Sequence, residues 1–154
     1  MYIDKADWHW ESTKKLYKEI HNIEGELSTK QVEEIWLLAS NHIGLFLRWI
    51  IDNHLEGEDV DEEICQKVRN GDITGAEYLM NELDGKFLEE DVNEEVLPFV
   101  KEYYDKMYFE DYGDTCPVGI QEEVPCYGFI SGDDDYNELK NKIDLAYKKF
   151  LQSR

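Results

Sequence analysis

The sequence predicts a mainly α-helical (α+β) protein, arranged as a single helical bundle-like domain. Apolar residues recur at steps of three and four through most of the chain, and glycine-containing turn signals divide it into segments of helical length. The composition agrees: 42% of the 154 residues are hydrophobic and 13% aromatic, enough for a core without disulfides or metals. The chain shows no repeat and no linker, so residues 1–154 are expected to form one domain.

The first half of the chain is expected to hold two helical regions. Residues 13–23 carry apolar side chains at helical spacing, and Gly25 ends this segment. The second region begins at Ser28, which forms an S-x-x-Q capping-box pattern with Gln31, and its apolar spacing continues to about His54. It is either one long helix or two helices with a joint near residues 40–44.

Four shorter helices are expected in the second half. Their ranges are residues 59 or 61 to 68, 73–83, 93–109 and 136–151. Pro98 requires that the third of them begin close before it or be kinked there, because an interior proline breaks the hydrogen-bond ladder. Within that helix, Tyr103 and Met107 are expected to continue the buried stripe. Between them and the last helix, glycines and prolines surround two short β-leaning pieces, which predicts a small β-hairpin or an ordered loop near residues 116–131.

Negative charge is the strongest feature of the composition. The chain has 36 acidic and 16 basic residues, a formal net charge of −20. Residues 56–138 hold 26 acids and 5 bases, whereas residues 139–154 are basic. Such a surface repels nucleic acid and anionic membranes and attracts basic partners. The alternative is that the charge only keeps the protein soluble.

The cysteines and the N-terminus predict a cytoplasmic protein. The three cysteines are an odd number and contain no C-x-x-C pair, which is typical of a reducing compartment. The N-terminal residues include charges and no apolar core of a signal peptide. The longest uncharged run, residues 35–47, is shorter than the roughly 20 residues needed to span a bilayer.

The sequence contains no established catalytic or phosphate-binding motif, so no catalytic residue, metal ligand or cofactor is expected. His42 and His54 are too far apart on one helix to share a metal, and both are expected to be structural. His9, between two tryptophans, is expected to serve packing and capping. The acids of residues 133–138 lack the glycine of a calcium loop and are better interpreted as an N-cap cluster.

Residues 103–114 are the best candidate for a partner-binding surface. Tyrosines recur there at steps of four and alternate with carboxylates, a composition that suits contact with lysine and arginine on another protein. The alternative is that these tyrosines are half-buried at the edge of the core. The candidate residues are Tyr104, Asp105, Tyr108, Glu110, Asp111, Tyr112 and Asp114.

Two motifs resemble an uncharacterised bacterial domain family over roughly residues 2–115. They are Tyr2-x-Asp4 followed by Asp7-Trp8-His9-Trp10, and the HIGxFLxWxI segment that begins at His42. The resemblance implies a small, acidic, cytosolic protein without established catalytic residues. Some members of the family look like immunity proteins encoded beside polymorphic toxins. The recurrence of both histidines in the motifs supports the hypothesis that His9 and His42 meet in a polar cluster.

Together these observations predict a non-catalytic immunity protein that binds a toxin in a contact-dependent inhibition or similar system. The expected partner is a cognate basic toxin domain of the nuclease type, held in a 1:1 complex with a monomer, with neither nucleic acid nor membrane as a partner. The alternative function is a small metal-dependent or hydrolytic enzyme that uses His9 and His42 with carboxylates.

Overall fold

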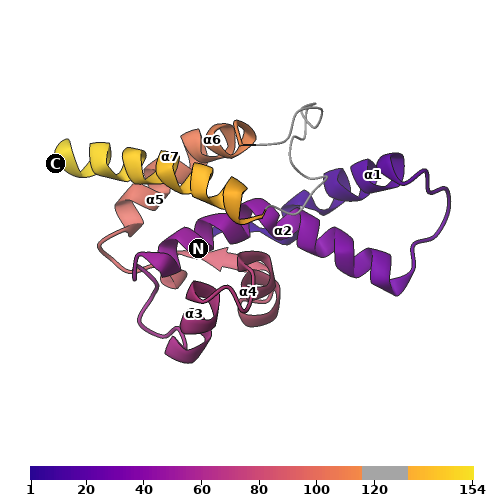
Figure 1. The fold of residues 1–154 in the computed structure, drawn as a ribbon, viewed down its shortest axis with the longest axis horizontal. Coiled ribbons are helices and arrows are strands. Elements are labelled where there is room, and N and C mark those ends of the chain that lie inside the picture. Colours follow the sequence, from indigo (N-terminus) through magenta and orange to yellow (C-terminus); the bar gives the residue numbers. More distant parts are fainter. Residues whose placement is uncertain (116–131) are drawn as a thin grey trace.

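Helix α2 (Thr29–Asp52) forms the centre of the fold in the computed structural model, which describes residues 1–115 and 132–154 (Figure 1). Its start is the capping box expected from the sequence: the Gln31 amide donates to Ser28 Oγ at 3.2 Å, and the Ser28 amide donates to Gln31 Oε1 at 2.8 Å. The helix continues without a joint, because the Ser40 hydroxyl donates to the Trp36 carbonyl within the helix instead of capping a new one. Most of its C-terminal half is buried.

The end of α2 is formed by the backbone of His54. The helix ends at Asp52, and His54 takes a left-handed conformation with φ of 56°. Its amide donates to the Ile51 carbonyl, and the amide of Leu55 donates to the Ile50 carbonyl, which is the Schellman pattern of helix termination. His54 is therefore structural through its main chain, while its side chain is exposed.

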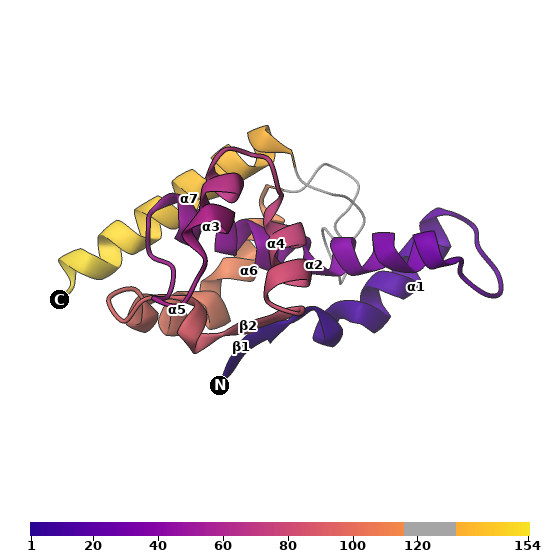
Figure 2. The same cartoon turned by 90° about the horizontal axis from the view of Figure 1, so that it is seen from below.

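Helix α1 (Trp10–Ile20) and the N-terminal half of α2 form an arm that extends from the rest of the molecule (Figures 1 and 2). A 3-10 turn, η1 (Ala6–His9), leads into α1, so this helix starts earlier than residue 13. The arm has a small apolar core of its own around Tyr17, Ile35 and Leu38. Beside it, the rings of Trp10 and Trp36 stack at 4.2 Å between centroids.

A two-stranded antiparallel sheet was not anticipated from the sequence. Strand β1 (Tyr2–Lys5) pairs with β2 (Lys86–Leu88), and a 3-10 turn, η2 (Glu89–Asp91), follows. Strands of four and three residues are too short for an alternating apolar pattern to be recognised. In Figure 2 the sheet lies at the lower edge of the molecule, and its first strand leads toward the start of α1. The β-hairpin or loop expected near residues 116–131 lies outside the described residues.

Helices α3 (Glu62–Arg69) and α4 (Gly75–Glu82) follow α2, as expected. The Asp61 carboxylate accepts from the Glu63 amide to cap α3, and Thr74 forms a capping box with Glu77 to start α4. Helix α4 packs against α2, and the two glycines Gly44 and Gly75 face each other there at backbone contact distance.

The next helical segment runs from α5 (Leu97–Tyr103) through the π-helical turn η3 (Tyr104–Tyr108) to α6 (Phe109–Gly113). Pro98 lies in its first turn, as expected, where its missing amide is harmless. The expectation that Met107 is buried is wrong, since its side chain is 53% exposed. A π-helical turn bonds residue i to i+5, so Tyr108 rather than Met107 follows Tyr103 into the core.

Helix α7 (Asp133–Gln152) packs across α2 on the side away from α3 and α4 in the view of Figure 1. The acids of residues 133–135 cluster in its first turn, as expected, and Asp135 accepts from the Gly132 amide at 3.2 Å; the N-cap position itself is Gly132 and not one of the acids. Residues 1–115 and 132–154 are mainly helical with one small sheet, and the mainly helical fold class is confirmed. No helix among the described residues is both long and apolar enough for a membrane crossing.

Candidate functional site

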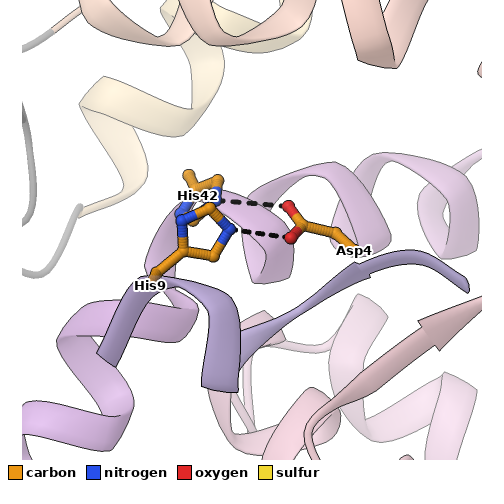
Figure 3. A group of neighbouring side chains, drawn as sticks. All are labelled: Asp4, His9 and His42. Carbon is orange, nitrogen blue, oxygen red and sulfur yellow. Dashed lines mark hydrogen bonds and ion pairs between the residues drawn. The ribbon is translucent and has the colours of Figure 1, made fainter. Parts of the chain in front are cut away.

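Two histidines far apart in the sequence converge on one buried carboxylate (Figure 3). Asp4 comes from β1, His9 ends η1, and His42 lies in the middle of α2. His9 Nε2 lies 2.7 Å from Asp4 Oδ1, and His42 Nε2 lies 3.4 Å from Asp4 Oδ2. The two imidazole rings meet edge to face at 4.3 Å between centroids. The hypothesis that His9 and His42 meet in a polar cluster is therefore confirmed.

The local structure explains why these three side chains meet. Strand β1 holds Asp4 opposite Phe87 of β2 and turns its side chain inward, leaving it only 5% exposed. The chain then turns through η1, which returns His9 toward the strand it has just left. The Thr13 hydroxyl donates to the His9 carbonyl at 2.7 Å and fixes this turn on α1.

Asp4 accepts further hydrogen bonds that orient its carboxylate. The Lys5 amide donates to Oδ1 at 2.8 Å, and the Tyr104 hydroxyl donates to Oδ2 at 2.7 Å. The Tyr108 hydroxyl donates to the His42 carbonyl, and this hydrogen bond connects the π-helical turn η3 to α2 at His42. Each carboxylate oxygen therefore has a donor besides an imidazole, as buried charges require.

The ionisation states of the cluster follow from its burial. Burial alone would raise the pKa of Asp4, but hydrogen bonds from His42 and His9 outweigh it and hold that pKa well below its usual range. Burial lowers the pKa of His42, which is 1% exposed, and this effect exceeds the opposing attraction of Asp4. Asp4 is therefore ionised and His42 neutral near pH 7. An ionised Asp4 can only accept, so His9 Nε2 is the donor in their hydrogen bond.

Sequence reasoning named His9 and His42 but missed Asp4. Asp4 is one of the residues that carry the family resemblance, but its place beside the two histidines was not predicted. The structure also corrects the candidate binding surface: Tyr104, Tyr108 and Tyr112 are core residues and not surface residues. The acids between them behave differently: Asp105, Glu110 and Asp114 are exposed, and Asp111 is half-buried.

The buried tyrosines instead support the histidine cluster. The Tyr104 and Tyr108 rings stack at 5.0 Å between centroids, and the Tyr112 ring lies 5.8 Å from the His42 ring. The Tyr112 hydroxyl accepts from Asn41 Nδ2 at 2.7 Å. The Tyr103 hydroxyl donates to Asp111 Oδ2 at 2.6 Å, so one oxygen of this carboxylate is hydrogen-bonded within the protein.

A second cluster of potential ligands surrounds Cys65 in α3, beside Glu56 and Glu62. Arg69 occupies its centre: it donates to Glu62 at 2.7 Å, to both Glu56 oxygens at 3.0 and 3.1 Å, and to the Ile51 carbonyl at 2.9 Å. The guanidinium already neutralises both carboxylates where a cation would bind. Burial and the charge of Glu56 raise the pKa of the Cys65 thiol to about 11. This cluster is an ion-pair network and not a metal site.

We expect the Cys65 thiol to be unreactive in the folded protein. In a Cys116→Ser, Cys126→Ser background, Cys65 is the one remaining cysteine. A pKa of about 11 leaves about 0.1% thiolate at pH 8, against roughly a quarter for an ordinary thiol of pKa 8.5. Iodoacetamide at pH 8 should therefore react at least about 100-fold more slowly than in urea. Equal rates in the two conditions would contradict the burial of this thiol.

An acidic cavity of about 280 Å³ lies between α3, α4 and η2. Carboxylates surround it, and its apolar lining comes from the loop before α3, from α3 itself and from the end of α4. The lining residues are Asp59, Val60, Asp61, Ile64, Tyr78, Glu82, Leu83, Glu90 and Asp91. Burial raises the pKa of Asp91, whereas Asp59, Glu82 and Glu90 are exposed carboxylates.

Comparisons with known proteins give a family but no activity. No curated protein and no solved structure matches the chain. One family model matches residues 2–125, a span that includes Asp4, His9, His42 and the acidic cavity. The match covers well over half of the chain, and the protein belongs to the family described as "Domain of unknown function (DUF7832)".

Proposed function

We propose that the protein is a non-catalytic immunity protein that neutralises a basic, nuclease-type toxin domain in the bacterial cytoplasm. The complex contains one copy of each protein, and neither nucleic acid nor membrane takes part. A nuclease concentrates lysine and arginine where the phosphates of its substrate bind. An acidic protein occupies the same patch and needs only fast association and slow release to inhibit it.

The acidic cavity is the observation that carries this proposal. It combines five carboxylates with an apolar lining, and so it fits the aliphatic stem and charged head of a lysine or arginine side chain. It also lies in the part of the chain with the greatest excess of acid, residues 56–138. The long-range field of that region attracts a basic partner, and the cavity offers a place for one of its side chains.

The structure favours this cavity over the surface chosen from the sequence. The sequence predicts a binding face on residues 103–114 that combines tyrosines with acids. In the structure, however, Tyr104, Tyr108 and Tyr112 are buried in the core. The exposed acids Asp105, Glu110 and Asp114 then lack the apolar contact area that gives an interface its affinity. We therefore place the main contact at α3 and α4 and expect the α6 acids to contribute only to the general field.

The alternative, a metal-dependent or hydrolytic enzyme, is supported by the convergence of His9 and His42 on Asp4. Burial argues against catalysis at this place. Asp4 and His42 are almost fully covered, and the Asp4 carboxylate is hydrogen-bonded to protein groups that a substrate would have to displace. Binding therefore remains the better proposal.

The proposal predicts that reversing charge at the cavity slows association with the toxin. The variant Asp59→Lys, Glu82→Lys, Glu90→Lys changes three exposed carboxylates that take part in no ion pair among the described residues. We expect the association rate with the catalytically inactive toxin domain of the neighbouring gene to fall at least about 10-fold, and protection on co-expression to be lost. Stopped-flow fluorescence at two salt concentrations measures the effect.

The matched control is Asp105→Lys, Glu110→Lys, Asp114→Lys, which makes the same change of net charge on η3, on α6 and at its end. We expect a smaller effect that disappears at high salt, because this face acts only through the field. Equal effects of the two variants would remove the cavity as the contact and leave only long-range steering. A wild-type protein that neither protects cells nor binds the toxin would overturn the proposed function.

A further inference from the structure

The three side chains of the buried cluster are spaced as ligands of one metal ion would be. One donor atom each from Asp4, His9 and His42 lie within 4.8 Å of one another. An ion held tetrahedrally at about 2.0–2.1 Å from its donors separates them by roughly 3.3 Å. The two nitrogen–oxygen separations, 2.7 Å from His9 to Asp4 Oδ1 and 3.4 Å from His42 to Asp4 Oδ2, lie on either side of that value, although they end on different oxygens of the carboxylate. An ion bound here requires His9 to move away from Asp4, because their 2.7 Å separation is shorter than a shared ion allows.

Chemistry selects the kind of ion. Two imidazole nitrogens and one carboxylate are typical ligands of zinc and other first-row divalent transition metals, whereas calcium and magnesium prefer oxygen donors. The Cys65 cluster, by contrast, has its acids paired with Arg69.

The surroundings provide the outer shell that metal sites use. Ligating carboxylates are held by further hydrogen bonds, and the Tyr104 hydroxyl and the Lys5 amide hold Asp4 in this way. Aromatic rings cover the His42 side: the Phe109 ring lies 5.1 Å from the imidazole between centroids. The His9 side chain remains 17% exposed, so an ion can reach the cluster from that side.

We propose that Asp4, His9 and His42 bind one divalent transition-metal ion, with Zn²⁺ as the best match, in a structural site that joins β1 and η1 to α2. The ion stabilises the fold and takes no part in contact with the toxin. Its site is formed by the N-terminal segment and the central helix, and the acidic cavity by α3, α4 and η2. The metal proposal and the proposed function therefore stand or fall separately.

The test is a metal titration of the full-length protein after removal of metals with EDTA. We expect one equivalent of Zn²⁺ to bind in competition with a chromophoric chelator. One equivalent of Co²⁺ should give the visible absorption of a low-symmetry site. With Zn²⁺ at about 100 times its dissociation constant, the Tm should rise by several degrees, since only the folded state binds.

Variants decide whether the cluster is the site. His9→Gln should weaken Zn²⁺ binding about 100-fold or more, because it removes one of the three ligands. His9 is chosen because it is the most exposed of the three, so its replacement disturbs the fold least. His54→Asn is the matched control: it removes an imidazole at an exposed left-handed position that asparagine tolerates, and binding should not change. Tyr104→Phe tests the outer shell and should cost about 10-fold.

Equal Zn²⁺ affinity in the wild type and His9→Gln would overturn the proposal, since the ion would then be held by surface carboxylates. Should His9→Gln fail to fold, the side-chain ¹⁵N resonances of the wild-type histidines provide the decision. Addition of Zn²⁺ should shift the Nε2 signals of His9 and His42 and leave those of His21 and His54 in place. Unshifted signals for His9 and His42 would equally overturn the site.

Discussion

Gly44→Ala should lower the free energy of unfolding by about 3 kcal/mol, although alanine favours helix over glycine. Gly44 lies in the middle of α2, where the chain passes closest to α4. A Cβ atom there would stand 2.3 Å from the Ala76 nitrogen and 2.5 Å from the Gly75 carbonyl carbon. These are backbone atoms and cannot rotate away. The helices would have to separate, which disturbs the core on both sides of the contact.

The reciprocal position gives the same result from the other helix. A Cβ on Gly75 would lie 1.9 Å from the Gly44 carbonyl oxygen, so Gly75→Ala should be comparably destabilising. Replacing glycine by alanine in a helix interior stabilises the helix by only about 1 kcal/mol, through the higher helix propensity of alanine. The steric cost is therefore the larger effect at both positions.

Gly113→Ala is the matched control for this prediction. Gly113 is also helical, but a Cβ there meets nothing within 4 Å. We expect its unfolding free energy to stay within about 0.5 kcal/mol of the wild type. Urea denaturation, with unchanged m-values, measures all three variants. A Gly44→Ala protein as stable as Gly113→Ala would show that α2 and α4 do not approach as closely as described.

Local signals in the sequence are sufficient to predict most of the helices. The hydroxyl cap at Ser28 operates through a neighbouring residue, so the pattern and the structure agree there. The close approach of Gly44 and Gly75 could not be predicted in the same way. Each glycine looks like an ordinary break or turn signal until the two segments are placed side by side.

The tyrosines of residues 103–112 show why the candidate surface was misplaced. A regular α-helix carries residues i and i+4 on one face, so Tyr103 was grouped with Met107 and apart from Tyr104. The π-helical turn at Tyr104–Tyr108 changes this grouping. Tyr103, Tyr104 and Tyr108 all enter the core, and Met107 points outward. Residue spacing alone carries no signal for a π-helical turn.

The histidine cluster was half predictable. The two motifs that carry the family resemblance contain both imidazoles, which was enough to suggest that they meet. Their common partner, Asp4, comes from a strand that the sequence pattern did not reveal, and its inward direction depends on pairing with β2. Tertiary contact, and not local propensity, turns three separate polar residues into one site.

Asp4→Ala should lower the free energy of unfolding by about 3–5 kcal/mol, measured with EDTA present so that bound metal cannot contribute. Asp7→Ala is the control, because this acid is three residues away and exposed, and it should change stability by no more than about 0.5 kcal/mol. Tyr104→Phe, which removes a single donor, should fall between them at about 1 kcal/mol.

The size of the Asp4 effect depends on what remains after the substitution. Burying a carboxylate is costly, and replacing a complete buried ion cluster by apolar groups is often neutral. Removing Asp4 alone is different: His9 Nε2, the Tyr104 hydroxyl and the Lys5 amide all lose the acceptor that the structure gives them. Each of these donors is at least partly desolvated, so water compensates poorly. If Asp4→Ala instead unfolds at the same urea concentration as Asp7→Ala, the carboxylate contributes nothing net to the fold, and a metal ion becomes the remaining reason for its burial.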